Sequence, residues 1–303
     1  MDTPESNLPA HEPEPGGSQE TSSAAGHGGP APAVVEGVPT LPPVPYAKYP
    51  EDLRAPWGWL DLIIFIFFGV GSMIVVSWAG FILIQILMGV SPLAYEKNPT
   101  ALTAHATLSQ ALWSLVMMLF LFVLVRVRFQ AHFWRTMGWR DLRIEGVNRV
   151  SGYLLCLISG SALAILISLA SGLVGTDKKL PIQELFQTRE SVLLVAATAV
   201  LVAPLVEETI FRGYLYPVLA RTFGISFGVI FTGMLFGLVH SMQLSGGYGQ
   251  IGLLMIVGIV LTYVRARTGT VLAPFLLHLG YNSLLFVAFY FATGGLQNLP
   301  GAR

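Results

Sequence analysis

Residues 203–212 read Ala-Pro-Leu-Val-Glu-Glu-Thr-Ile-Phe-Arg, which places Glu207, Glu208 and Arg212 in a run otherwise apolar enough for a membrane helix. A charge at bilayer depth costs at least ~2.5–3.5 kcal/mol. On a helix, Glu208 and Arg212 lie four residues apart and can pair along one face. Glu207 points roughly 100° away from Glu208 and needs other partners. The stretch therefore predicts a functional site within a membrane helix.

The composition predicts that most of the chain lies in lipid. Of its 303 residues, 53% are hydrophobic and 11% are charged, whereas soluble domains average about 25% charged residues. Residues 1–54 contain eight acids and two bases, and the remaining chain contains nine acids and fifteen bases. No basic surface is dense enough to predict nucleic acid as a partner. Cys156 is the single cysteine, so it forms no intrachain disulfide, and its apolar neighbours indicate a small core residue rather than a catalytic thiol.

The chain divides by composition into a polar tail and a hydrophobic body. Residues 1–54 are rich in Pro, Gly and Glu, which predicts a disordered cytoplasmic tail without the features of a secretory signal. Seven apolar stretches follow, at 58–88, 106–125, 149–175, 191–219, 225–243, 250–264 and 270–293. Crossing a bilayer takes roughly 20 such residues, and a helix satisfies its backbone polar groups internally. The predicted fold class is an all-α, polytopic transmembrane helix bundle with seven or eight spans.

Loop charges predict the topology of this body. Residues 55–190 are expected to hold the N-terminal transmembrane helices with an Arg-rich amphipathic loop at 126–149, residues 191–293 the core with the polar groups, and residues 294–303 a short tail. With seven spans, eleven bases lie on one side and five on the other. The excess of bases on the cytoplasmic side then places the amino terminus in the cytoplasm and the carboxyl terminus outside. For the loop arginines, topology signalling is favoured over lipid binding.

Polar side chains also lie in the later apolar stretches. Phe236 and His240 share a helix face at a spacing of four residues, and so do His278 and Asn282. A lone membrane histidine is more often a structural hydrogen-bonding group than a catalyst. Ionisable groups on three successive helices favour a functional site instead.

Helix geometry predicts that these groups converge. If the chain turns near 221–224, Glu207 and His240 lie about 21 and 24 Å from the same end of their helices, at 1.5 Å per residue. By the same count, His278 lies about 14 Å from that side. Antiparallel packing therefore brings the three side chains to one site. Pro204 removes a backbone N–H and can kink its helix, which fits a hydrated cavity or an ordinary membrane-helix proline equally well.

The residue types in this constellation suit hydrolysis. A carboxylate in a low-dielectric site can act as a general base, and a neighbouring histidine can help to orient water. A second histidine and an asparagine can donate hydrogen bonds to a developing oxyanion. Together these groups predict an amide hydrolase that activates water and needs no side-chain nucleophile.

Three spaced motifs carry a family resemblance: Glu207-Glu208-x-x-x-Arg212, Phe236-x-x-x-His240 and His278-x-x-x-Asn282. In this order, on successive membrane helices, they resemble the CPBP family, which unites the CAAX prenyl endopeptidases with bacteriocin-immunity-type (Abi-like) membrane proteins. The resemblance covers roughly 190–293. It implies a glutamate-dependent intramembrane endopeptidase that cleaves a membrane-bound or lipid-anchored polypeptide.

The resemblance implies a role for each residue by motif position. Glu207 would activate water with help from His240, and His278 and Asn282 would stabilise the oxyanion. No cofactor is required on this interpretation. A divalent metal such as zinc, held by Glu207, His240 and His278, is the alternative, but no His-Glu-x-x-His motif is present and a metal-free site is favoured.

The remaining motif residues would support this centre. Glu208 with Arg212 would form a supporting ion pair, and Phe236 would pack beside His240. A proton-coupled transporter stays open as an alternative, because buried Glu, His and Arg also build ion relays, but no internal repeat is visible. A non-catalytic immunity or scaffold protein is a further alternative. The expected location is a bacterial cytoplasmic (plasma) membrane, crossed several times.

Overall fold

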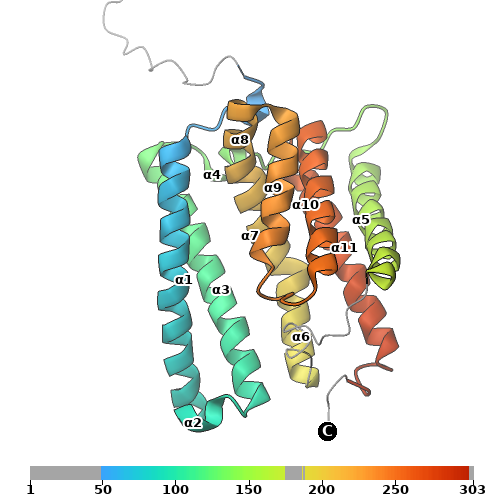
Figure 1. Ribbon diagram of the computed structural model, residues 1–303. Coiled ribbons are helices and arrows are strands. Elements are labelled where there is room, and N and C mark those ends of the chain that lie inside the picture. Colours follow the sequence, from blue (N-terminus) through green and yellow to red (C-terminus); the bar gives the residue numbers. More distant parts are fainter. Residues whose placement is uncertain (1–48, 175–185, 187, 300–303) are drawn as a thin grey trace, which may run out of the picture. The chain divides into compact units, whose positions relative to one another are not determined.

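The computed structural model describes residues 49–174, 186 and 188–299 (Figure 1). All of them belong to one compact unit, Pro43–Arg303. Most of the predicted tail, 1–48, therefore lies outside the described residues. The described residues form helices and no strand, so the predicted all-α class is confirmed.

Within the described part of the chain, six helical segments are long and apolar enough to cross a membrane. They are α1 (Trp59–Met88), α3 (Pro99–Val123) with its continuation η2 (Leu124–Arg128), α5 (Arg149–Leu173), the run Arg189–Phe223, α10 (Tyr248–Thr268) and α11 (Leu272–Ala292). The shorter elements are η1 (Glu51–Leu53), α2 (Pro92–Tyr95), α4 (Phe133–Thr136) and α9 (Ile225–Val239).

Two predicted stretches have different lengths in the structure. The stretch at 225–243 forms α9, which ends at Val239 after 15 residues. At 1.5 Å per residue this helix covers about 22 Å, less than the roughly 30 Å of a hydrocarbon core. The stretch at 250–264, predicted to be short, is the 21-residue helix α10.

The run Arg189–Phe223 is a continuous helix in which α-helical and π-helical segments alternate. It consists of α6 (Arg189–Ala197), the π-helical segment η4 (Thr198–Val202), α7 (Ala203–Glu208), the π-helical segment η5 (Thr209–Leu215) and α8 (Tyr216–Phe223). In η4 the N–H of Ala203 bonds the carbonyl of Thr198, five residues back. The next residue, Pro204, has no N–H to continue this pattern. The two carboxylates Glu207 and Glu208 thus lie in a short α-helix between two π-helical segments, which often occur at functional sites.

Glycines bring neighbouring helices into close contact. Figure 1 shows α9 and α10 side by side, and a Cβ added to Gly233 of α9 would lie 2.4 Å from the backbone nitrogen of Ile259 in α10. On the other side of the core, a Cβ added to Gly280 of α11 would lie 2.1 Å from the carbonyl oxygen of Leu157 in α5. Small residues let membrane helices approach in this way. The helices α9 and α11, which carry polar motif residues, therefore contact their neighbours α10 and α5 backbone to backbone.

Several bases that the topology count assigns to loops have specific partners. Arg221 donates from its guanidinium to the carbonyls of Leu53, Ala55 and Trp57 at 2.6–2.9 Å. The buried Arg265 pairs with Asp52 at 3.0 Å. These bonds fasten the segment before α1 to the ends of α8 and α10, so the two arginines stabilise the fold whatever they contribute to topology.

The Arg-rich stretch at 126–149 also packs on the bundle. Its apolar side chains Phe133, Met137 and Leu142 are buried. Trp139 donates from its indole nitrogen to the hydroxyl of Thr209, at 3.1 Å. Much of the apolar face of this amphipathic stretch thus packs against the protein. The stretch also contacts the helical run that carries the two carboxylates.

Candidate active site

The structure brings the predicted polar residues of three helical elements together. His240, at the end of α9, has its Nε2 atom 3.7 Å from Oε1 of Glu207. His278 of α11 has its Nε2 atom 3.9 Å from Oε2 of the same carboxylate. The predicted convergence is therefore present in the structure, with Glu207 between the two imidazoles.

The ion pair predicted between Glu208 and Arg212 is fully buried. Their charged atoms lie 2.8 Å apart, and both side chains are 0% exposed. Arg212 also donates to the hydroxyl of Thr262 at 3.1 Å and to the carbonyl of Gly258 at 2.9 Å. A buried pair is favourable only when additional hydrogen bonds satisfy its charges. Here α10 supplies them for Arg212, whereas Oε2 of Glu208 is buried without a hydrogen-bond partner.

His278 connects the two glutamates. Its Nδ1 atom lies 2.9 Å from Oε1 of Glu208. A carboxylate accepts hydrogen bonds, so Nδ1 carries the proton of this bond. The ring is thereby oriented with Nε2 toward Glu207. The buried Glu208–Arg212 pair therefore positions His278 and, through it, one side of the site.

His240 is oriented by its own helix. Its Nδ1 atom lies 2.7 Å from the carbonyl oxygen of Phe236, which can only accept, so Nδ1 donates and Nε2 is directed to Glu207. The Phe236 ring lies 4.9 Å from the His240 ring and 5.8 Å, edge to face, from the His278 ring. The guanidinium of Arg212 lies 4.6 Å from the centre of the Phe236 ring. Phe236 therefore packs against both histidines and the arginine, more than the predicted contact with His240 alone.

Asn282 makes a bond that the sequence does not predict. Its side-chain nitrogen donates to the carbonyl oxygen of Ala199, at 2.7 Å. In the five-residue bonding pattern of η4, this carbonyl would receive the N–H of residue 204, which is a proline. Asn282 thus supplies the hydrogen bond that Pro204 cannot make. Since an amide nitrogen carries two hydrogens, one donor remains for a ligand.

Two residues of this network carry no motif signal. Thr262 bonds Arg212 and also the carbonyl of Gly258, which lies four residues earlier on α10. Thr209, buried next to Glu208, bonds Trp139. Isolated threonines in an apolar run are common in membrane helices because they can bond their own backbone. Their spacing therefore does not distinguish them from structural threonines.

Glu207 and His240 form the accessible part of the site. Their side chains are 22% and 19% exposed, whereas Glu208 and Arg212 are enclosed. The site thus has a buried support and one open carboxylate flanked by two imidazole nitrogens. Such a group can bind water and take a proton from it.

The metal alternative concerns Glu207, His240 and His278. Among the residues that the structure describes, no three His, Cys, Asp or Glu side chains are placed as a metal-binding group. The Nδ1 atoms of His240 and His278 are engaged with Phe236 and Glu208, so only the Nε2 atoms face Glu207. Metal-binding histidines are commonly oriented by bonds of this kind at the other ring nitrogen, so both the metal-free site and the metal site stay predictions.

The helical fold and the match to a protein-family model together indicate the class of protein. With its six membrane-length helices it is an integral multi-pass membrane protein. Residues 189–284 match the family model described as type II CAAX prenyl endopeptidase Rce1-like, and this segment contains every motif residue described above. The search of curated proteins and the search of solved structures each returned no match. Residues 189–284, about a third of the chain, are thus similar to the CAAX-type intramembrane protease family, which agrees with the CPBP resemblance.

Proposed function

We propose that this protein is an intramembrane endopeptidase in which Glu207 activates a water molecule. The observation that carries the proposal is the position of Glu207. Its carboxylate is partly open and lies within 4 Å of two imidazole nitrogens, each oriented by a hydrogen bond at the opposite ring atom. Oriented groups of this kind need little reorganisation during a reaction.

The reaction proceeds by proton transfer and addition. Glu207 takes a proton from water held between it and His240, and the resulting hydroxide attacks the carbonyl carbon of a peptide bond. The oxyanion accepts hydrogen bonds from the free N–H of Asn282 and from His278 when its Nε2 carries a proton. The proton on Glu207 then passes to the leaving nitrogen as the C–N bond breaks. The products are a carboxylic acid and an amine, and all atoms come from water and substrate.

We propose a membrane-bound or lipid-anchored polypeptide as the substrate. The site lies among helices that expose apolar side chains to lipid, so a substrate anchored in the same bilayer reaches it by lateral diffusion. The proposal places the protein in a bacterial cytoplasmic membrane with its amino terminus in the cytoplasm. It requires no metal, and a divalent ion on Glu207, His240 and His278 is the alternative that a chelator distinguishes.

The test compares the ends of membrane proteins in three strains. Terminal peptide mapping of membranes with wild-type protein and with Glu207→Gln should reveal peptides whose cleavage needs Glu207. Glu190→Gln is the matched control, since Glu190 is an exposed carboxylate on the same helical run. Identical termini in all three strains, with the Glu207→Gln protein folded in the membrane, would overturn the proposal.

A further inference from the structure

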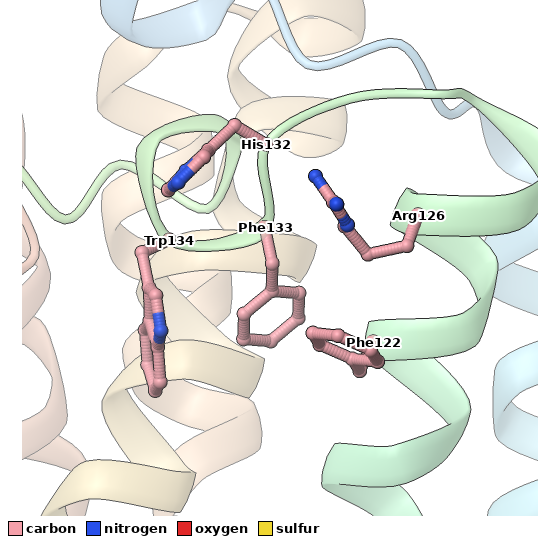
Figure 2. A pocket seen from close by; sticks show the side chains of 5 residues that line it. All are labelled: Phe122, Arg126, His132, Phe133 and Trp134. Atoms are coloured by element: carbon pink, nitrogen blue, oxygen red, sulfur yellow. The ribbon is translucent and has the colours of Figure 1, made fainter.

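A small cavity lies at the end of α3, beside the Arg-rich stretch. It has a volume of about 200 Å³ and is lined by Phe122, Arg126, His132, Phe133 and Trp134 (Figure 2). Figure 2 shows the nitrogens of Arg126 and His132 on either side of Phe133, toward the loop, with the tilted rings of Phe122 and Phe133 next to each other below. The cavity thus combines a cationic rim with an aromatic floor.

Arg126 differs in its partners from four of the neighbouring arginines. Arg128 pairs with Asp61 at 3.0 Å, and Arg149 pairs with Asp141 at 2.9 Å. The neighbouring arginines at 135 and 140 both approach one glutamate, at position 51. Within the described part of the chain, Arg126 has no carboxylate at ion-pair distance, and its side chain makes one long bond of 3.5 Å to the carbonyl of Ala131. A cation in a cavity without an internal acid is suited to an external anion.

The position of the cavity along the helix indicates where that anion comes from. Arg126 lies in the last turn of the apolar segment Thr100–Arg128. Trp134, 43% exposed, lines the same cavity. Tryptophan and arginine gather at the boundary between hydrocarbon and water, where phospholipid headgroups lie. The cavity therefore has the composition of a headgroup site rather than of a site for a soluble anion.

An apolar track leads from the cavity along α3. Leu115, Leu119 and Phe122 are exposed, and with Arg126 they follow one another at spacings of four, three and four residues. This spacing keeps them on one face of a helix. An acyl chain lying on this face would leave its phosphate level with Arg126.

We propose that this cavity binds the phosphate of an anionic phospholipid. Arg126 pairs with the phosphate, His132 bonds a second phosphate oxygen, and Trp134 contacts the glycerol region. The acyl chains lie on the exposed face of α3. This site is independent of the peptidase reaction and takes its ligand from the bilayer that surrounds the protein.

The test measures lipid retention by the full-length protein. Native mass spectrometry of protein in mixed micelles of phosphatidylcholine and phosphatidylglycerol gives the fraction of molecules with bound phosphatidylglycerol at each mole fraction. Arg126→Gln should weaken the apparent affinity about tenfold or more, the effect of losing a hydrogen bond to a charged group. The matched control is Arg143→Gln, since Arg143 is an exposed arginine of the same stretch that lies outside the cavity. This control should retain phosphatidylglycerol like the wild type.

Further measurements distinguish a lipid phosphate from a soluble anion and from general surface attraction. Equal losses in Arg126→Gln and Arg143→Gln would show general surface attraction and overturn the site. Inorganic phosphate at millimolar concentration should not displace the lipid, and full displacement would assign the cavity to a soluble anion instead. His132→Gln gives a second variant on the same rim and should also weaken retention. Unchanged retention in both cavity variants would refute the proposal.

Discussion

Replacement of Gly280 by alanine tests how strictly the contact between α5 and α11 positions His278. An alanine Cβ at this site would lie 2.1 Å from the carbonyl oxygen of Leu157, whereas ordinary contacts begin at about 3.4 Å. The obstacle is backbone, so the two helices must separate by about 1.3 Å to accommodate the methyl group. His278 lies two residues before Gly280 and moves with α11.

Two effects of known size follow from this displacement. A misplacement of about 1 Å in a catalytic arrangement can lower a rate about 10²-fold. Overpacking a close interface costs about 1–3 kcal/mol of unfolding free energy, and the higher helix propensity of alanine offsets up to about 1 kcal/mol of it. We therefore expect Gly280→Ala to lose about two orders of magnitude in kcat while it loses no more than about 3 kcal/mol of stability.

The assay needs a substrate peptide identified by terminal mapping and purified protein in detergent. Cleavage rates at saturating substrate report kcat, and thermal unfolding followed by tryptophan fluorescence reports stability. Gly172→Ala is the matched control, because Gly172 also lies in a membrane helix and an added Cβ there meets nothing within 4 Å. Wild-type cleavage and stability in Gly280→Ala would refute the claim that this contact positions His278.

Three further predictions concern the support of the site and its chemistry. Arg212→Met should lower the unfolding free energy by about 3–5 kcal/mol because it leaves Glu208 buried without its cation, and adding Glu208→Leu should recover much of that loss in denaturant titration. Asn282→Ala should cost about 1–3 kcal/mol by leaving the Ala199 carbonyl unpaired. In a double-mutant cycle, Pro204→Ala should reduce this cost by restoring an N–H, and strict additivity would contradict it. Cleavage should persist after dialysis against a strong chelator, and loss of activity that zinc restores would favour the metal alternative.

Helix geometry was sufficient to predict the convergence of Glu207, His240 and His278. The prediction rests on about 1.5 Å per residue and on turns near 221–224 and 269, and the helices end at Phe223 and Thr268. The π-helical segment η5, which lies between Glu207 and the first turn, is not predicted by this count. The predicted stretch at 225–243 runs four residues past the end of α9 at Val239. Three of these four residues, His240, Ser241 and Gln243, are polar, so the sequence does contain a local signal for the end of the helix.

The hydrogen bond from Asn282 to the carbonyl of Ala199 could not be predicted from the sequence, for a different reason. A proline frees the carbonyl four residues back in an α-helix, which would be Val200, but the π-helical pattern of η4 moves the free carbonyl to Ala199. The pairing of Arg265 with Asp52 joins residues 213 positions apart in the chain. Charge counting could assign such bases to a side of the membrane but not to a partner.

The two π-helical segments also constrain the length of this part of the chain. Each holds one residue more than an α-helix with the same bonding would need, and α7 lies between them. Removing the extra residue from η4 restores α-helical bonding there, so the helix that follows keeps its present face and Glu207 stays directed to the histidines. A residue removed from α7, which holds no extra residue, turns the flanking parts of the helix relative to each other by about 100° and shortens the run by about 1.5 Å. Single-residue deletions within 198–202 should therefore disturb the site less than deletions within 203–208, even where the helix itself still forms in both cases.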